Sequence, residues 1–354
     1  MAIDPMVCAG CGSCAALCPS TAITYQAPDF RYGVMRMRTL AQAYRAVDGG
    51  APRLLVHDAH GAEMIRLAAR FGRGLPADVI PMEVSALSGF GHSEMVSALA
   101  VGFARVDVLL APRTERAALE REQELAEALA GPGRLALLDE ADPDALSDLL
   151  YEAAPGAAPG RAILPMGNRR QAARMAAQAL NPDAEAPLAL PDGAPYGAVL
   201  VNTEACTLCL SCVSLCPSGA LVDNPDMPQL RFQEEACLQC GICARICRED
   251  AIALRPQMDL SDAALTQVVL NEEEPFLCVE CGSPFGVKST VERIMEKLAG
   301  NHEMFATSEA ARMIAMCDNC RVNAQFHSEN NPFAADPKPR VRTTEDYLSK
   351  RRDH

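Results

Sequence analysis

Hydrophobic and polar positions follow two alternating patterns through the middle of the chain, over residues 51–181. Short apolar runs, such as Arg53–His57 and Val106–Ala111, are separated by stretches in which apolar residues recur every third or fourth position, as in Met64–Phe71. Apolar runs of about four to eight residues are typical of strands buried on both faces, and the longer period is typical of amphipathic helices. The alternation predicts βαβ units and a parallel sheet.

Strands and helices are expected to alternate throughout this segment. The predicted fold class is α/β plus α+β, with a three-layer, flavodoxin- or Rossmann-like domain at 51–181 beside cysteine-rich segments. Residues 182–196, rich in Pro, Ala, Asp and Gly, are predicted to be a linker. We expect strands at 22–25, 53–57, 79–82, 106–111, 135–138 and 162–164, and helices at 38–47, 64–71, 94–104, 115–130, 143–153 and 169–180.

All sixteen cysteines lie outside the α/β segment, with none between residues 19 and 205. Disulfides suit small secreted domains rather than a chain of 354 residues. The cysteines instead form four groups of four, with none left over, which indicates a metal-binding protein. The groups are Cys8, Cys11, Cys14 and Cys18; Cys206, Cys209, Cys212 and Cys216; Cys237, Cys240, Cys243 and Cys247; and Cys278, Cys281, Cys317 and Cys320.

Three of these groups have the spacing C-x₂-C-x₂-C-x₃-C, in CAGCGSCAALCP, CTLCLSCVSLCP and CLQCGICARICR. This is the run of bacterial ferredoxins, in which three closely spaced thiolates wrap a 4Fe–4S cube and the fourth ligates the other cluster of a pair. A proline follows the fourth cysteine in the first two runs, as Pro19 and Pro217, and Arg248 replaces it in the third.

The second and third runs are twenty residues apart, which allows a two-cluster ferredoxin domain at 197–256. Strands are expected at 198–201, 220–222, 229–232 and 251–254. Structural zinc in these two runs is the disfavoured alternative. Crossed ligation predicts one cluster on Cys206, Cys209, Cys212 and Cys247, and another on Cys237, Cys240, Cys243 and Cys216.

The first run has no partner run beside it in the sequence. Cys8, Cys11 and Cys14 are predicted to hold a third 4Fe–4S cluster in an N-terminal segment at 1–50. Its fourth ligand is either Cys18 or a group from another segment or chain.

The last group consists of two C-x₂-C pairs, Cys278/Cys281 and Cys317/Cys320, separated by 35 residues. Two such knuckles closing on one tetrahedral ion are the zinc-ribbon arrangement, and Gly282 suits the turn after the first pair. A four-cysteine knuckle domain is expected at 257–335, with helices at 287–298 and 309–316. Zinc, a fourth 4Fe–4S cluster and thiols without a metal remain open.

The α/β segment carries weaker signals at two strand ends, His57–Gly61 and Ser85–His92. Open α/β sheets bind ligands at such ends. No G-x-G-x-x-G follows the first strand, so a nicotinamide or flavin site is not supported. Each histidine is expected to be a helix cap or a surface residue, and the charged helix at 115–130 is expected to have a solvated face.

Charge and composition narrow the class of partner. The net charge of −14, the absence of Trp and only 5% aromatic residues argue against a nucleic-acid binder. No apolar run approaches the ~20 residues of a membrane helix, and no secretory signal is visible, so a cytoplasmic protein is expected. A basic tail at 336–354 is expected to be solvated or to dock a partner.

Two resemblances follow from these residues. Residues 198–255 resemble two-cluster bacterial ferredoxins, and residues 53–112 resemble the iron–sulfur (delta) subunit family of methyl-viologen-reducing hydrogenase and heterodisulfide reductase. That family joins a hydrogenase or formate dehydrogenase to an electron-transfer partner and uses cysteines where this chain has Ala111, Pro112 and Arg113. The resemblance therefore implies a scaffold or docking domain without the family's 2Fe–2S centre.

The whole arrangement, including CVECGSPFGVKSTVERIMEKLAG, resembles iron–sulfur proteins encoded with molybdenum-dependent formate dehydrogenases. It implies a non-catalytic electron-transfer subunit that passes single electrons between such a dehydrogenase and another carrier. The alternatives are an assembly or redox-sensing factor, and an oxidoreductase subunit that binds a flavin or substrate in its α/β domain.

Overall fold

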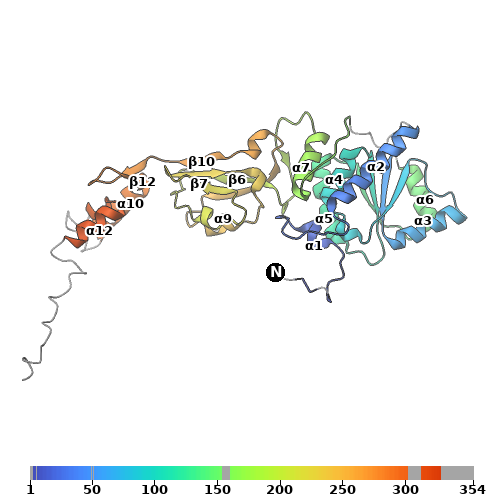
Figure 1. Ribbon diagram of the computed structural model, residues 1–354, viewed down its shortest axis with the longest axis horizontal. Helices are drawn as coiled ribbons and strands as arrows, with labels where there is room; N and C mark the ends of the chain where they lie inside the picture. The colour runs from blue at the N-terminus through green and yellow to red at the C-terminus, as the bar shows by residue number, and fades with distance from the viewer. Residues whose placement is uncertain are drawn as a thin grey trace, which may run out of the picture. The chain divides into compact units, whose positions relative to one another are not determined.

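A computed structural model describes residues 3–4, 6–48, 50, 52–153, 160–301 and 312–327 (Figure 1). The expected basic tail at 336–354 lies outside these residues. The chain divides into two compact units, each assembled from separate stretches. The first comprises 1–202, 210–222 and 231–270, and the second comprises 203–209, 223–230 and 271–354.

A parallel four-stranded sheet forms the centre of the first unit, in the order β2-β1-β3-β4. One of its two central strands, β1, is buried along its whole length, as expected for a strand covered on both faces. The predicted mixed α/β class with a parallel sheet is thus confirmed. The strands are β1 (Arg53–His57), β2 (Val79–Glu83), β3 (Arg105–Leu109) and β4 (Leu135–Leu138).

Helices cover both faces of this sheet (Figure 1). Leu55 points into a core with helices α3 and α6, whereas its neighbours Leu54 and Val56 point into the larger core with α2, α4, α5 and α7. This alternation follows from the two-residue period of a strand. The helices are α2 (Phe30–Asp48), α3 (Ala59–Phe71), α4 (His92–Val101), α5 (Arg116–Ala130), α6 (Pro143–Glu152) and α7 (Arg169–Leu180).

Side chains at the helix starts explain where several of these helices begin. Asp58 accepts hydrogen bonds from the amides of His60 and Gly61 at the start of α3. Asn168 accepts from the Gln171 amide at the start of α7, and the Gln171 side chain accepts from the Asn168 amide in return. Both are the caps that these residue types favour.

Several sequence expectations differ from the structure. Residues 22–25 and 162–164 form no strand, and the Ile163 amide instead donates to the carbonyl of Ala100 at 2.9 Å. Helix α2 begins at Phe30 rather than Arg38, because Val34, Met37 and Ala41 continue a helical stripe that is fully buried in the larger core.

A second sheet in the first unit has the order β5-β9-β6. Strands β6 (Gly197–Val201) and β9 (Ile252–Met258) pair antiparallel over five residues, and β5 (Leu188–Ala189) lies within the stretch predicted as a linker. Tyr196 and Met258 belong to the larger core together with helix α7. The cysteine-rich segment and the parallel sheet therefore share one hydrophobic core.

The remaining elements include a third sheet, in the order β10-β8-β7, and a two-stranded hairpin of β11 and β12. No helix within the described ranges is long and apolar enough to cross a membrane. The bounds are β7 (Leu221–Asp223), β8 (Gln229–Phe232), β10 (Val268–Glu272), β11 (Pro275–Leu277), β12 (Pro284–Val287), α10 (Lys288–Asn301) and α12 (Asp318–Phe326), with the short helices α1 (Ser13–Leu17), α8 (Ser211–Ser214), α9 (Ile242–Ile246), η1 (Leu87–Gly89), η2 (Glu234–Ala236) and η3 (Asp262–Leu265).

Candidate metal centres

The three C-x₂-C-x₂-C-x₃-C runs share one backbone conformation. In each run a positive φ, between 48° and 79°, occurs just before the second cysteine, just after it, and three residues after the fourth. A short helix carrying the third cysteine follows the second of these positions. The residues are Gly10, Gly12 and Thr21 in the first run, Leu208, Leu210 and Gly219 in the second, and Gln239, Gly241 and Asp250 in the third.

Positive φ angles outside glycine are confined to these runs within the described part of the chain. They occur at Thr21, Leu208, Leu210, Gln239 and Asp250. Such residues are strained and concentrate at functional sites. Alternating right- and left-handed residues also turn successive N–H groups toward one point, a concave arrangement that binds anions and iron–sulfur clusters. The backbone thus suits an anionic cluster in all three runs.

One crossed set of cysteines lies together in the first unit. Cys216, Cys237, Cys240 and Cys243 line one small cavity, whose remaining wall includes the apolar Leu254. Burial raises the pKa of the Cys243 thiol to about 11, and the charges of Cys237, Cys240 and Cys216 act in the same direction. Four thiolates this close together repel one another unless cations lie among them. The four cysteines therefore suit the iron ions of a cluster, which are positively charged.

The other crossed set is divided between the two units. Cys206 and Cys209 belong to the second unit, and Cys212 and Cys247 to the first. Their assignment to one cluster therefore rests on the spacing of the runs.

The first run is anchored on the parallel-sheet domain. The Tyr25 hydroxyl donates to the carbonyl of Gly10 at 2.7 Å. A Cβ atom at Gly89 would lie 3.0 Å from the carbonyl oxygen of Cys11, so this close approach favours glycine. Hydrogen bonding, first from the Ser13 amide, lowers the pKa of the Cys11 thiol. The first run therefore packs against η1 of the parallel-sheet domain.

The fourth cysteine of this run occupies a turn also found in the second run. The Sγ atom of Cys18 lies 3.5 Å from the Ser20 hydroxyl, and that of Cys216 lies 3.7 Å from the Ser218 hydroxyl. In a paired unit this turn serves the other cluster. The turn itself does not identify the fourth ligand of the first cluster.

The four C-terminal cysteines come together at a single point in the second unit. Each Sγ atom of Cys278, Cys281, Cys317 and Cys320 lies within 4.8 Å of the others, and those of Cys281 and Cys317 are 3.7 Å apart. The first pair turns between β11 and β12, and the second pair begins helix α12. The arrangement fits one metal ion.

His92 lies in the buried interior, which corrects the expectation of a capping or surface residue. Its Nε2 lies 2.8 Å from the Tyr196 hydroxyl, and its Nδ1 lies 2.6 Å from the Glu122 carboxylate. Hydrogen bonds from His92 outweigh burial and lower the pKa of Glu122. Glu122 lies on helix α5, which was expected to have a solvated face. This helix therefore also makes a buried polar contact. His57 is buried as well.

Arg170 is a further residue of the site that sequence reasoning did not identify. Its guanidinium donates to the carbonyls of Cys237, Pro195 and Glu235, at 2.6, 2.6 and 2.9 Å. It also lies over the Tyr196 ring, 4.4 Å from the centroid. A fixed positive charge thus contacts the backbone of a candidate cluster ligand. Its position within helix α7 gave no local signal of this contact.

A comparison with family models matches residues 205–252 to the 4Fe-4S dicluster domain. The chain therefore contains a ferredoxin-type iron–sulfur domain. This match covers the second and third runs, and agrees with the cavity lined by Cys216, Cys237, Cys240 and Cys243. A search of curated proteins gave no match to the chain. The dicluster domain indicates electron transfer through 4Fe–4S clusters.

Proposed function

We propose that this protein is a relay that passes single electrons through three 4Fe–4S clusters, between a dehydrogenase and another carrier. The observation that carries the proposal is the left-handed backbone pattern repeated in all three runs. The second and third runs lie in the matched dicluster domain, and the first run repeats their conformation at the same three positions. A third cluster is therefore assigned to the first run.

The ligand sets of this proposal follow the crossed pattern in the dicluster domain. The first run uses its own four cysteines, with Cys18 as the fourth ligand. The sets are Cys206, Cys209, Cys212 and Cys247; Cys237, Cys240, Cys243 and Cys216; and Cys8, Cys11, Cys14 and Cys18.

A 4Fe–4S cluster supplies one-electron chemistry with little change in geometry. The chain's own groups bind and tune it. Backbone amides of the left-handed turns would donate to a bound cluster, and apolar residues such as Phe232 and Leu254 would limit water around one ligand set. Arg170 adds a fixed positive charge beside Cys237, which favours the more negative, reduced state.

We propose zinc at the C-terminal four-cysteine site. Zn–S bonds of about 2.3 Å in a tetrahedron place sulfurs about 3.8 Å apart. The distance of 3.7 Å between the Sγ atoms of Cys281 and Cys317 fits this geometry. A cubane binds each thiolate at a different iron corner and spaces the sulfurs more widely. The ion would be redox-inert and would connect the β11–β12 hairpin to helix α12.

The proposed partner is a molybdenum-dependent formate dehydrogenase in the cytoplasm, on the strength of the resemblances above. The proposed division of labour assigns clusters to 1–50 and 197–256, docking to the α/β domain at 51–181, and structural stability to the four-cysteine knuckle domain at 257–335. The net charge of −14 would favour association with a basic partner face.

Metal and sulfide analysis of anaerobically prepared protein tests the relay. We expect about twelve irons, about twelve sulfides and one zinc per chain, with EPR signals from three reduced clusters during reductive titration. About sixteen irons without zinc would instead identify a fourth cluster at the C-terminal four-cysteine site. Protein that contains about eight irons would contradict the third cluster, and iron-free protein would contradict the relay.

A further inference from the structure

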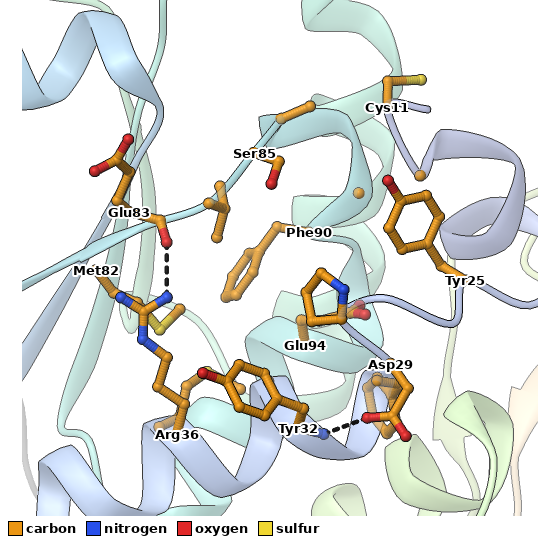
Figure 2. A pocket seen from close by; sticks show the side chains of 18 of the residues that line it. Cys11, Tyr25, Asp29, Tyr32, Arg36, Met82, Glu83, Ser85, Phe90 and Glu94 are labelled. Atoms are coloured by element: carbon orange, nitrogen blue, oxygen red, sulfur yellow. Dashed lines mark hydrogen bonds between the residues drawn. The ribbon is translucent and has the colours of Figure 1, made fainter. Parts of the chain in front are cut away.

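A pocket opens in the first unit beside the first cysteine run, at the carboxyl end of β2 (Figure 2). Its volume is about 180 Å³. The turn after β2 forms one wall, the start of helix α2 forms another, and the backbone at Gly10–Gly12 closes one end. Part of the segment Ser85–His92, a possible ligand site in the sequence, therefore lines a cavity at a strand end. Open α/β sheets bind ligands at such ends.

Aromatic and apolar side chains form most of this pocket. The rings of Tyr25, Tyr32 and Phe90 surround it, and Pro28 and Met82 complete the wall (Figure 2). A well-formed apolar pocket with a few convergent polar groups is typical of a small-molecule site. Aromatic walls favour a flat ring, which can stack against them or meet their edges.

The lining carries the donors Arg36, Arg169 and the Ser85 hydroxyl, beside the carboxylates of Asp29, Glu83 and Glu94. Arg36 donates through Nη1 to the Glu83 carbonyl at 2.9 Å, and its guanidinium carries further N–H donors. The buried Glu94 is already engaged, because its two oxygens accept from Arg169 at 2.8 Å and from the Gly91 amide at 3.2 Å. The pocket thus offers Arg36 and the Ser85 hydroxyl to ligand oxygens.

We propose that this pocket binds the ring of a quinone. Quinones and flavins both present flat rings with carbonyl oxygens to such a site. The volume favours the smaller ring system. An apolar cavity of about 150 Å³ holds one benzene ring, so a pocket of about 180 Å³ suits a quinone of one or two rings better than the three fused rings of a flavin. Tyr32 and Phe90 contact the ring, and Arg36 donates to a carbonyl oxygen.

The position of the pocket gives the ring a role that rests on the proposed relay. Cys11, a proposed ligand of the first cluster, lines the same pocket. Two electrons that leave the first cluster one at a time, together with two protons from water, convert the quinone to a quinol. The first cluster would hold one electron at a time, so it would be reduced again through the other clusters before it gave the second electron; the dehydrogenase at the other end of the proposed relay supplies both electrons.

Gly33 permits a variant that fills the pocket without disturbing its walls. It lines the pocket within helix α2, and no atom lies within 4 Å of a Cβ built at this position. Gly33→Leu therefore adds a side chain at the pocket lining, where open space can receive it, and exchanging glycine inside a helix favours folding. Gly33→Ala is the matched small control, and Arg31→Gln controls for Arg36→Gln on the same helix.

The test is calorimetric titration of oxidised, cluster-loaded protein with 1,4-naphthoquinone and, separately, with riboflavin. We expect naphthoquinone to bind, with affinity at least about tenfold lower in Gly33→Leu and Arg36→Gln and little changed in Gly33→Ala and Arg31→Gln. Equal binding by Gly33→Leu, or binding of riboflavin alone, would overturn the proposal.

A second measurement separates this proposal from the relay itself. Reduced protein is mixed with naphthoquinone and the loss of the cluster EPR signals is followed. Fast reoxidation in Gly33→Ala and slow reoxidation in Gly33→Leu support the pocket. Equal rates overturn its role in electron transfer even where all three clusters are present. A protein without clusters contradicts the relay, while the binding titration still tests the pocket.

Discussion

At the scale of single residues, Arg170 is the clearest case of a side chain whose chemistry depends on distant partners. It lies on helix α7, in the sequence segment of the parallel-sheet domain, yet donates to the carbonyl of Cys237. Nothing in the local pattern of α7 distinguishes it from Arg169. The cysteines, by contrast, were identified from spacing alone, because cluster ligands must be close in sequence to share one loop.

Replacing Arg170 with Gln removes a fixed charge next to one cluster. We expect the reduction potential of that cluster to fall by on the order of tens of millivolts, because the positive charge stabilises the reduced state. EPR-monitored redox titration measures the change. Arg66→Gln, an exposed charge on α3, is the control and should leave all potentials unchanged. An unchanged potential in Arg170→Gln would contradict the tuning role.

The buried contact between His92 and Glu122 gives a prediction about pH. Hydrogen bonds to His92 hold the pKa of Glu122 below its ordinary value, against the opposing effect of burial. The ionised Glu122 therefore stabilises the fold above its unfolded pKa, and this contribution is lost as the pH falls through the lower folded value. Glu122→Gln should lower stability by about 1–3 kcal/mol near pH 7.

Unfolding midpoints of wild type and Glu122→Gln, measured between neutral and acid pH, check this sign. The difference should shrink as the pH approaches the acid end of the range. A difference that grows on acidification would contradict the assignment. The sequence around His92 predicted a cap or surface residue, because its partners lie 30 and 104 positions away in the chain.

At the scale of elements, the shared turn of Cys18 and Cys216 makes the fourth ligand of the first cluster testable. If Cys18 closes this cluster, Cys18→Ser lowers the iron content from about twelve to about eight or eleven per chain and changes one EPR signal. Cys281→Ser is a cysteine control outside the three runs. An unchanged iron count and spectrum would assign the fourth ligand to another segment or chain.

Most elements were predictable because their burial is strong and regular. β1 and β4 have the expected bounds, and α7 begins and ends where its capping residues and apolar stripe indicate. Residues 162–164 failed as a strand because an apolar triplet can also pack irregularly, with the Ile163 amide bonded to the end of α4. Periodicity cannot distinguish the two for so short a run.

At the scale of the whole molecule, zinc at the C-terminal four-cysteine site predicts that the protein can lose this metal without a change in the number of electrons it takes up. Cys278→Ser should remove the zinc, because three thiolates and one weak ligand bind it less tightly. The number of electrons taken up in a reductive titration should stay at about three. Loss of one electron equivalent together with four irons would show a cluster at this site instead.

The division of the chain at this scale was least predictable from sequence. The composition of residues 182–196 predicted a linker, whereas the structure has β5 and the buried Tyr196 there. Each compact unit combines three separate stretches, and such long-range assembly has no local pattern. The composition of a proline-rich stretch shows that it is not a helix, but not whether it packs.

The core shared by Tyr196, Met258 and helix α7 has a consequence for the expression of fragments of this chain. A fragment spanning only 194–260 would keep Tyr196 and Met258 but lose helix α7, which belongs to the same core, and the apolar side chains exposed in this way would favour aggregation. Excising a minimal ferredoxin from this chain should therefore yield insoluble material, whereas a cut that retains the preceding sheet domain should not. The clusters and the sheet domain would have to be expressed as one piece.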